Sequence, residues 1–296
     1  MAFIVIPRWT MHRRAVKRRP RRYSRRVGTD TKTPAATIIL VREGAKGVET
    51  LLMRRHRKSS FMSNTFVFPG GKLDPDDASL PAAAIRELFE EAGVLLVRGP
   101  APDPAMLAAW RVRLNAHEVT FAELLTSEKL EPDFDRLHAW SRWVTPSVEP
   151  KRFDATFYLA EMPAGQSTSY DDRETVEEAW VTPAEGSARH TDPAIDFKLP
   201  PPQLRTLHEL AAAGSTLAAV VAAADRRAPH VAPVMPRFAE LPGTKMALLL
   251  PWDPEYTTLG QGDAVDWAAA SPLGGGPSRF LMEGTSWRLV DPSGAS

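Results

Sequence analysis

The strongest structural signals in the chain lie in residues 66–96, whose sequence is FVFPGGKLDPDDASLPAAAIRELFEEAGVLL. Pro-Gly-Gly at positions 69–71 predicts a sharp turn, whose backbone conformation disfavours residues with side chains. Apolar residues then recur at helical spacing, which predicts a helix from Ser79 or Leu80 to Ala92. Ser79 or a preceding Asp can cap the start of this helix, and Gly93 supplies its C-terminal stop. The segment therefore predicts a turn followed closely by an amphipathic helix.

Three glutamates crowd one face of the predicted helix, because Glu87, Glu90 and Glu91 stand at positions i, i+3 and i+4. The opposite face is apolar and can pack against a core. Like charges at this spacing repel one another by about 0.2–0.5 kcal/mol per pair on an isolated helix. A hard divalent cation, Mg²⁺ or Mn²⁺, would reverse this repulsion, since carboxylate oxygens are its preferred ligands. The alternative for these residues alone is a solvated acidic face.

Other residues near the helix suit a phosphate-containing ligand. Gly70 and Gly71 place accessible backbone beside the acids, where amide groups can approach a phosphate. Arg54 and Arg55, upstream of the turn, can hold phosphates through charge-assisted hydrogen bonds, although a solvated strand end is an equal alternative. Arg86 can pair with the neighbouring glutamates and orient them.

Residues 70–94 resemble the Nudix box, G-x5-E-x7-R-E-U-x-E-E-x-G-U, in which U is apolar. The motif positions are filled by Gly71, Arg86, Glu87, Leu88, Glu90, Glu91, Gly93 and Val94. One position departs from the motif, because Asp77 replaces the first Glu and eight residues instead of seven separate it from Arg86. This spacing and the lead-in LLMRRHRKSSFMSNT resemble the coenzyme A diphosphatase branch, especially its organellar animal members. The Gly-Gln pair of the bacterial coenzyme A signature is absent.

The resemblance implies an α/β fold, the Nudix α-β-α sandwich with a mixed β-sheet. It implies hydrolysis of a pyrophosphate bond in a nucleoside diphosphate linked to another moiety, with Mg²⁺ or Mn²⁺ as cofactor. Coenzyme A or acyl-coenzyme A, cleaved to 3′,5′-ADP and (acyl-)phosphopantetheine, is the expected substrate. An ADP-ribose or NADH pyrophosphatase and a catalytically silent nucleotide- or RNA-binding module are the alternatives.

The resemblance also assigns roles to residues. Glu90 and Glu91 become metal ligands, Glu87 a ligand or the group that orients water, and Arg86 a catalytic positioning group. A further acid can come from the box or from a later loop that is otherwise a solvated turn. The candidates for this acid are Asp77, Glu174, Glu177 and Glu178. Family members often form homodimers, which is a further expectation here.

The chain divides into three parts. Residues 1–32 form a basic leader, residues 33–198 the Nudix domain, and residues 199–296 a helical and then short-stranded C-terminal extension. Strand patterns at 34–43 and 48–56 predict a hairpin, and residues 99–135 read as a helical insertion.

Composition narrows the function classes further. The 296 residues include no Cys, which excludes disulfides and thiolate chemistry. Residues 1–30 carry ten Lys or Arg against one acid, so the remainder has 37 − 10 = 27 basic and 36 − 1 = 35 acidic residues. We expect a disordered leader, with nucleic-acid binding or an organellar transit segment as the lesser alternatives. No run of eighteen apolar residues occurs, so we expect a cytoplasmic protein without a membrane span.

Overall fold

A computed structural model describes residues 32–57, 62–228, 231–241, 244–265 and 275–292. Nearly all of the predicted basic leader, residues 1–31, therefore lies outside the described residues.

Strand β1 (Thr33–Gly44) organises the main sheet. Its end forms the predicted hairpin with β2 (Gly47–Arg55), in which Val41 pairs with Thr50. Along most of its length β1 also pairs in parallel with β6 (Phe153–Glu161), and its first half pairs antiparallel with β4 (Gly70–Lys72). The predicted glycine turn is thus attached to a central strand.

The main sheet has eight strands in the order β3-β2-β1-β6-β5-β8, with β4 on β1 and β7 on β2. Its parallel pairs are β1 with β6 and β5 with β8, and the other pairs are antiparallel, so the sheet is mixed as expected. The strands not yet defined are β3 (Phe66–Val67), β5 (His138–Val144), β7 (Thr175–Val181) and β8 (Pro233–Val234).

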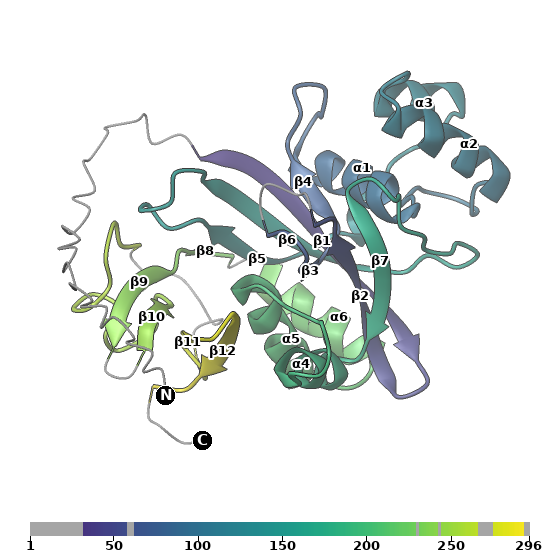
Figure 1. The fold of residues 1–296 in the computed structure, drawn as a ribbon. Helices are drawn as coiled ribbons and strands as arrows, with labels where there is room; N and C mark the ends of the chain where they lie inside the picture. Colours follow the sequence, from purple (N-terminus) through teal and green to yellow (C-terminus); the bar gives the residue numbers. More distant parts are fainter. Residues whose placement is uncertain (1–31, 58–61, 229–230, 242–243, 266–274, 293–296) are drawn as a thin grey trace, which may run out of the picture. The chain divides into compact units, whose positions relative to one another are not determined.

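Helices cover both faces of this sheet, which confirms the predicted α-β-α sandwich (Figure 1). Helix α1 shares one hydrophobic cluster with the two helices of the insertion. The helices of this layer are α1 (Leu80–Ala92), α2 (Pro104–Asn115) and α3 (Phe121–Ser127). The second cluster belongs to the other layer. Its helices are α4 (Pro183–Thr191), α5 (Pro201–Ala213) and α6 (Leu217–Arg227).

Helix α1 forms where the sequence predicts it. The Ser79 hydroxyl caps its start by accepting a hydrogen bond from the Ala82 amide at 3.3 Å. Gly93 ends it with φ of 75°, a left-handed conformation that favours glycine. Leu88 and Phe89 are fully buried against the sheet, so the acidic face is held in a fixed direction.

The C-terminal region contains a second, antiparallel sheet in the order β12-β11-β10-β9. Its strands are β9 (Arg237–Leu241), β10 (Thr244–Leu249), β11 (Arg279–Glu283) and β12 (Ser286–Val290). Residues on both sides of the predicted boundary at 198 share one hydrophobic cluster, which includes Leu207 and Leu210 of α5 and Trp140 and Trp143 of β5. The two tryptophans therefore pack in the core, as the strand pattern favours. The division into domains stays a prediction.

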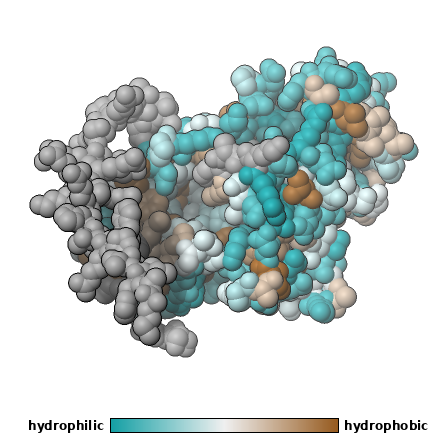
Figure 2. Space-filling model, in the orientation of Figure 1, coloured by the Kyte–Doolittle hydropathy of each residue, from teal (hydrophilic) through white to brown (hydrophobic). Residues whose placement is uncertain are grey.

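The described surface in Figure 2 is mostly hydrophilic, with its hydrophobic residues in small separate patches. Within the described residues, no single helix is long and apolar enough to cross a bilayer. Helices α5 and α6 meet that criterion only as a pair bent by 113°.

Candidate active site

Arg86 is the centre of a hydrogen-bonded acidic cluster on α1. Its Nη1 donates to the Glu87 carboxylate at 3.0 Å and to the Glu90 carboxylate at 2.9 Å. Its Nε and Nη2 donate to the two oxygens of Asp77, each at 2.9 Å, and Nη2 also reaches the Lys72 carbonyl at 3.0 Å. One buried guanidinium therefore fixes three carboxylates and the end of β4.

Asp77, the residue that departs from the Nudix box, binds Arg86 side by side through both oxygens. Its side chain is 4% exposed and also accepts a hydrogen bond from the Asp74 amide at 2.9 Å. This geometry makes Asp77 a support for Arg86. Sequence reasoning left its role open, because the pairing depends on how the loop folds back on the helix.

Gly70 and Gly71 stand where a Cβ atom would collide with neighbouring groups. A Cβ at Gly71 would lie 2.3 Å from Oε1 of Glu87, and a Cβ at Gly70 would lie 2.4 Å from the Ala36 carbonyl oxygen of β1. The Gly70 amide donates to Oε2 of Glu91 at 3.0 Å. The two glycines therefore bring backbone into direct contact with the carboxylates.

Glu91 is the most deeply buried acid of the cluster, at 3% exposure. Its Oε2 accepts the Gly70 hydrogen bond, whereas its Oε1 is buried without a hydrogen-bond partner. Burial and repulsion from Glu87 raise its pKa well above the ordinary range, and Arg55 opposes this shift. A buried oxygen without a partner costs about 1–3 kcal/mol or more, so a functional cause is expected.

Burial also raises the pKa values of the other two glutamates. The pKa of Glu87 rises to about 7, because burial and the charge of Glu90 outweigh the attraction of Arg86. Glu90 shifts in the same direction, chiefly through burial. Burial therefore disfavours the charged forms of all three glutamates, and Arg86 offsets this only in part.

The two upstream arginines point in different directions. Arg54 is already paired, because its guanidinium binds Glu177 at 3.0 Å as well as Asp196 and Asn64. Arg55 lies near the acidic cluster, since it lowers the pKa of Glu91, and its Nε is buried without a partner. Of the two, Arg55 is placed to meet a ligand at the cluster.

The three acids predicted for the later loop, Glu174, Glu177 and Glu178, have different surroundings. Glu174 approaches the cluster closely enough to raise the pKa of both Glu87 and Glu91 by repulsion. Glu177 is bound to Arg54, and Glu178 accepts a hydrogen bond from Thr168 at 3.1 Å on the strand β7. Glu174 is therefore the loop acid that the structure brings to the site.

The donor set fits a hard divalent cation. It consists of carboxylate oxygens, one of them buried without a partner, and a cation would favour the charged forms that burial disfavours. Within the described residues, no three His, Cys, Asp or Glu side chains are already gathered at metal-binding distances. Hydrogen bonds explain this, because Glu87 and Glu90 both turn to Arg86 while Glu91 turns to Gly70.

Comparison with known proteins finds a family that resembles the part of the chain around α1. Residues 75–210 match the model of the NUDT19 Nudix domain, and this range includes α1 with its acidic cluster. This part of the chain is similar to a Nudix domain. Helix α1 is therefore the Nudix helix, and the mixed sheet between two helical layers is the Nudix fold.

Proteins named as acyl-coenzyme A diphosphatases are among the relatives that the chain resembles. The chain is 36% identical over 152 residues to a human protein named acyl-coenzyme A diphosphatase NUDT19, covering 46% of this chain and 40% of that protein. The protein of the same name from Xenopus laevis is 27% identical over 227 residues, covering 55% of this chain and 59% of the relative. The chain thus spans about half the length of the curated relatives it matches.

A solved structure agrees with the fold. The crystal structure of a Nudix hydrolase from Alicyclobacillus acidocaldarius is 25% identical, with a TM-score of 0.56. The match covers 66% of this chain and 97% of that chain.

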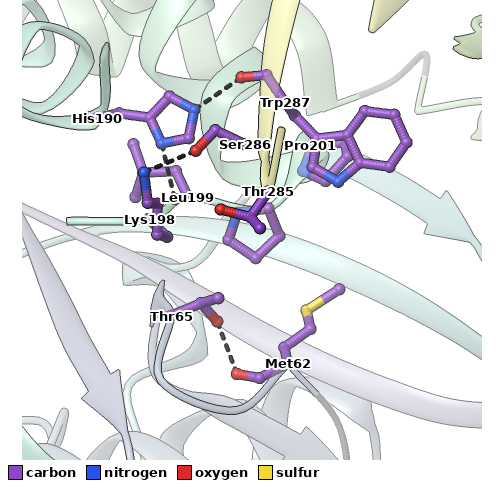
Figure 3. Close-up of a pocket in the computed structure, with 10 residues that line it drawn as sticks. Met62, Thr65, His190, Lys198, Leu199, Pro201, Thr285, Ser286 and Trp287 are labelled. Carbon is purple, nitrogen blue, oxygen red and sulfur yellow. Dashed lines mark hydrogen bonds between the residues drawn. The ribbon is translucent and has the colours of Figure 1, made fainter. Parts of the chain in front are cut away.

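A pocket of about 160 Å³ lies between the β11–β12 turn and the segment that joins α4 to α5 (Figure 3). His190, Lys198, Ser286 and Trp287 are among its lining residues, and no residue of the acidic cluster lines it. The candidate active site is therefore the acidic cluster of the Nudix helix, which contains the unpartnered oxygen of Glu91, and not this pocket.

Proposed function

We propose that this chain is a divalent-cation-dependent Nudix hydrolase that cleaves the pyrophosphate bond of coenzyme A or acyl-coenzyme A. The products are 3′,5′-ADP and phosphopantetheine or its acylated form. The observation that carries the catalytic part is the buried Glu91 carboxylate, whose free Oε1 lies within an acidic cluster of the Nudix helix. The names of the human and Xenopus relatives support the substrate class.

Glu87, Glu90 and Glu91 would hold the cation, Mg²⁺ or Mn²⁺. When bound, the cation stabilises the negative charge that develops on the diphosphate and makes water a stronger nucleophile. Arg86 keeps Glu87 and Glu90 on one side of the helix through its Nη1, while Asp77 holds Arg86 itself. The protein thus fixes the ligands before the substrate arrives.

The remaining roles belong to the groups around the cluster. The backbone of Gly70 and Gly71 and the guanidinium of Arg55 face the diphosphate. Glu174 or Glu87 takes a proton as a water oxygen attacks one phosphorus atom and the bond from that phosphorus to the bridging oxygen breaks. The bridging oxygen leaves with the other phosphate, which completes the hydrolysis.

A substrate panel tests the proposal. Purified protein with Mg²⁺ or Mn²⁺ is incubated with coenzyme A, an acyl-coenzyme A, ADP-ribose, NADH and a dinucleoside polyphosphate. We expect 3′,5′-ADP from the first two, identified by mass spectrometry, with ¹⁸O-labelled water showing which phosphorus is attacked.

The other outcomes are equally informative. Turnover of ADP-ribose or NADH alone would replace the coenzyme A assignment with the second substrate class. No turnover of any compound would support a silent binding module and contradict the enzyme proposal. An exposed-site variant, Glu118→Gln, serves as the matched control for changes in the cluster.

The oligomeric state and compartment stay predictions. A homodimer would appear in multi-angle light scattering as twice the mass of the chain, and cytoplasmic location is checked by fractionation of the source cells.

A further inference from the structure

We propose that Arg111, in the helical insertion, is a positioning residue that holds the last turn of the Nudix helix in place for cation binding. The inference rests on the proposed function, because Glu90 and Glu91 of that turn are the proposed ligands. Arg111 lies on α2, outside the Nudix box. Its guanidinium donates hydrogen bonds to backbone carbonyls of the Nudix helix.

The contacts of Arg111 are with the carbonyl groups of the two ligand residues. Its Nε donates to the Glu90 carbonyl at 3.0 Å, and its Nη2 donates to the Glu91 carbonyl at 2.6 Å. Asn115, one helical turn further along α2, donates to the Glu90 carbonyl at 3.2 Å. The helical insertion thus hydrogen-bonds to the backbone of both residues that carry the proposed ligand carboxylates.

These contacts complete the end of the helix. The last four carbonyls of a helix have no partner within it. In the Nudix helix the Phe89 carbonyl accepts from the Gly93 amide at 2.9 Å, and the Ala92 carbonyl accepts from the Ser169 amide at 3.1 Å. The two carbonyls between them are those that Arg111 binds, so all four are satisfied.

The C-terminal end of the Nudix helix favours a positively charged side chain from outside the helix. The C-terminal end of a helix carries partial negative charge and favours basic residues. The last turn of the Nudix helix contains no basic residue and instead holds Glu90 and Glu91. The guanidinium of Arg111 supplies the missing positive charge from a neighbouring helix.

Glycine at position 93 makes room for this contact. Its φ of 75° favours glycine, and a Cβ there would lie 2.9 Å from Nη1 of Arg111. The box glycine therefore serves both the turn of the chain and the approach of the guanidinium.

Arg111 also connects the Nudix helix to the loop that carries Glu174. Its Nη1 donates to the Ser169 hydroxyl at 2.7 Å, and its Nη2 donates to the Ser169 carbonyl at 2.9 Å. The same helix α2 is anchored by Leu107 and Leu114, which are 5% and 4% exposed in the cluster that includes the Nudix helix. Helix α2 is therefore anchored in the core, and Arg111 contacts two parts of the candidate site from it.

The test compares Arg111→Met with Arg113→Met, an exposed arginine on the same helix. Two quantities are measured: the Kd for Mn²⁺ without substrate, by electron paramagnetic resonance, and kcat and KM on the substrate panel. Loss of a group that orients metal ligands typically lowers metal affinity or activity by about 10–100-fold. We expect Arg111→Met to weaken Mn²⁺ binding and lower kcat by about tenfold, with KM nearly unchanged and Arg113→Met like wild type.

Arg111→Lys keeps the positive charge but cannot reach both carbonyls, and we expect values between wild type and Arg111→Met. This variant decides the question if Arg111→Met does not fold. Equal Mn²⁺ affinity and kcat in Arg111 and Arg113 variants would overturn the proposal. Failure of the proposed function is distinguishable, because a wild-type protein that binds Mn²⁺ without turnover still reports the Arg111 effect. A wild-type protein that binds no Mn²⁺ would overturn both.

Discussion

Two buried ionic clusters lie on opposite faces of the main sheet, and their charges are balanced in opposite ways. On the Nudix helix, the single guanidinium of Arg86 serves the carboxylates of Asp77, Glu87 and Glu90. Beside them, Oε1 of Glu91 is buried without a partner. The carboxyl groups of this cluster outnumber the guanidinium that binds them.

The second cluster lies on α5 and contains one carboxylate and two guanidinium groups. Glu209 accepts hydrogen bonds from Arg205 at 2.7 Å, from Arg227 at 2.6 Å and from the Trp140 indole at 3.0 Å. The remaining donors of Arg205 reach the carbonyls of Gly275 and Pro277. Every oxygen of this carboxylate is satisfied by the protein itself. The comparison teaches that a buried ionic cluster serves stability when its groups are satisfied and suits a ligand when one remains unsatisfied.

The largest expected effect is on stability and belongs to the satisfied cluster. Glu209→Gln leaves the buried guanidinium of Arg205 and the half-buried guanidinium of Arg227 without their counter-charge, which costs about 3–5 kcal/mol in free energy of unfolding. Urea denaturation measures this loss, with the exposed Glu240→Gln as control. A change below 1 kcal/mol would show that the cluster is not what stabilises this face of the sheet.

The next effect is on activity and belongs to the unsatisfied cluster. Glu91→Gln removes a proposed cation ligand and should lower kcat by about 100-fold, equivalent to about 2.7 kcal/mol. The free energy of unfolding without metal should not fall, because the variant also removes a charge that burial disfavours. Wild-type kcat in this variant would refute the assignment of Glu91.

Added cation gives a smaller, reversible effect on the same cluster. Mn²⁺ at ten times its Kd should stabilise the wild-type protein by about 1.4 kcal/mol. Thermal unfolding with and without Mn²⁺ measures this, and Glu91→Gln should lose most of the shift. Equal stabilisation of both proteins would place the cation elsewhere.

The smallest expected effect concerns a third buried contact, where His190 holds the C-terminal hairpin. Its Nδ1 accepts a hydrogen bond from the Leu199 amide at 2.9 Å, so its Nε2 donates to the Trp287 carbonyl at 2.7 Å (Figure 3). Burial lowers its pKa, and the charge of Lys198 adds to this shift. Protonation would place a hydrogen on Nδ1 against the Leu199 amide.

The sign of the pH dependence follows from that shift. The unfolded chain binds a proton near pH 6.5, whereas the folded chain binds it only at lower pH. Stability should therefore fall as pH drops below about 6.5, by at most about 1.4 kcal/mol per pH unit. His190→Gln should reduce this slope relative to wild type, and an unchanged slope would exclude His190 as its source. Burial also lowers the pKa of His208, but that residue contributes equally to both proteins.

The sequence predicts the parts of the site that local periodicity determines. The helix over 80–92, its Gly93 stop and the hairpin before it are confirmed, because each follows from spacing within a few residues. The family of the domain follows from the same short segment.

The contacts that cross the fold could not be predicted from the sequence. Asp77 and Arg86 meet through a loop conformation that no spacing rule describes, and Arg111 reaches the Nudix helix from an insertion with weak helical amphipathicity. Arg54 and Arg55 are adjacent in sequence, yet neighbouring strand residues face opposite sides of a sheet. One therefore meets Asp196 and the other lies near Glu91.

The position of Trp140 has a consequence for any attempt to work with a smaller piece of the protein. The family match ends at residue 210, inside α5, while Arg227 stacks on the Trp140 ring at 4.0 Å from beyond that point. A fragment cut at the family boundary would lose Arg227 and α6 and would open the core beneath β5 to water. The part that similarity recognises therefore omits α6, which shares a hydrophobic core with it.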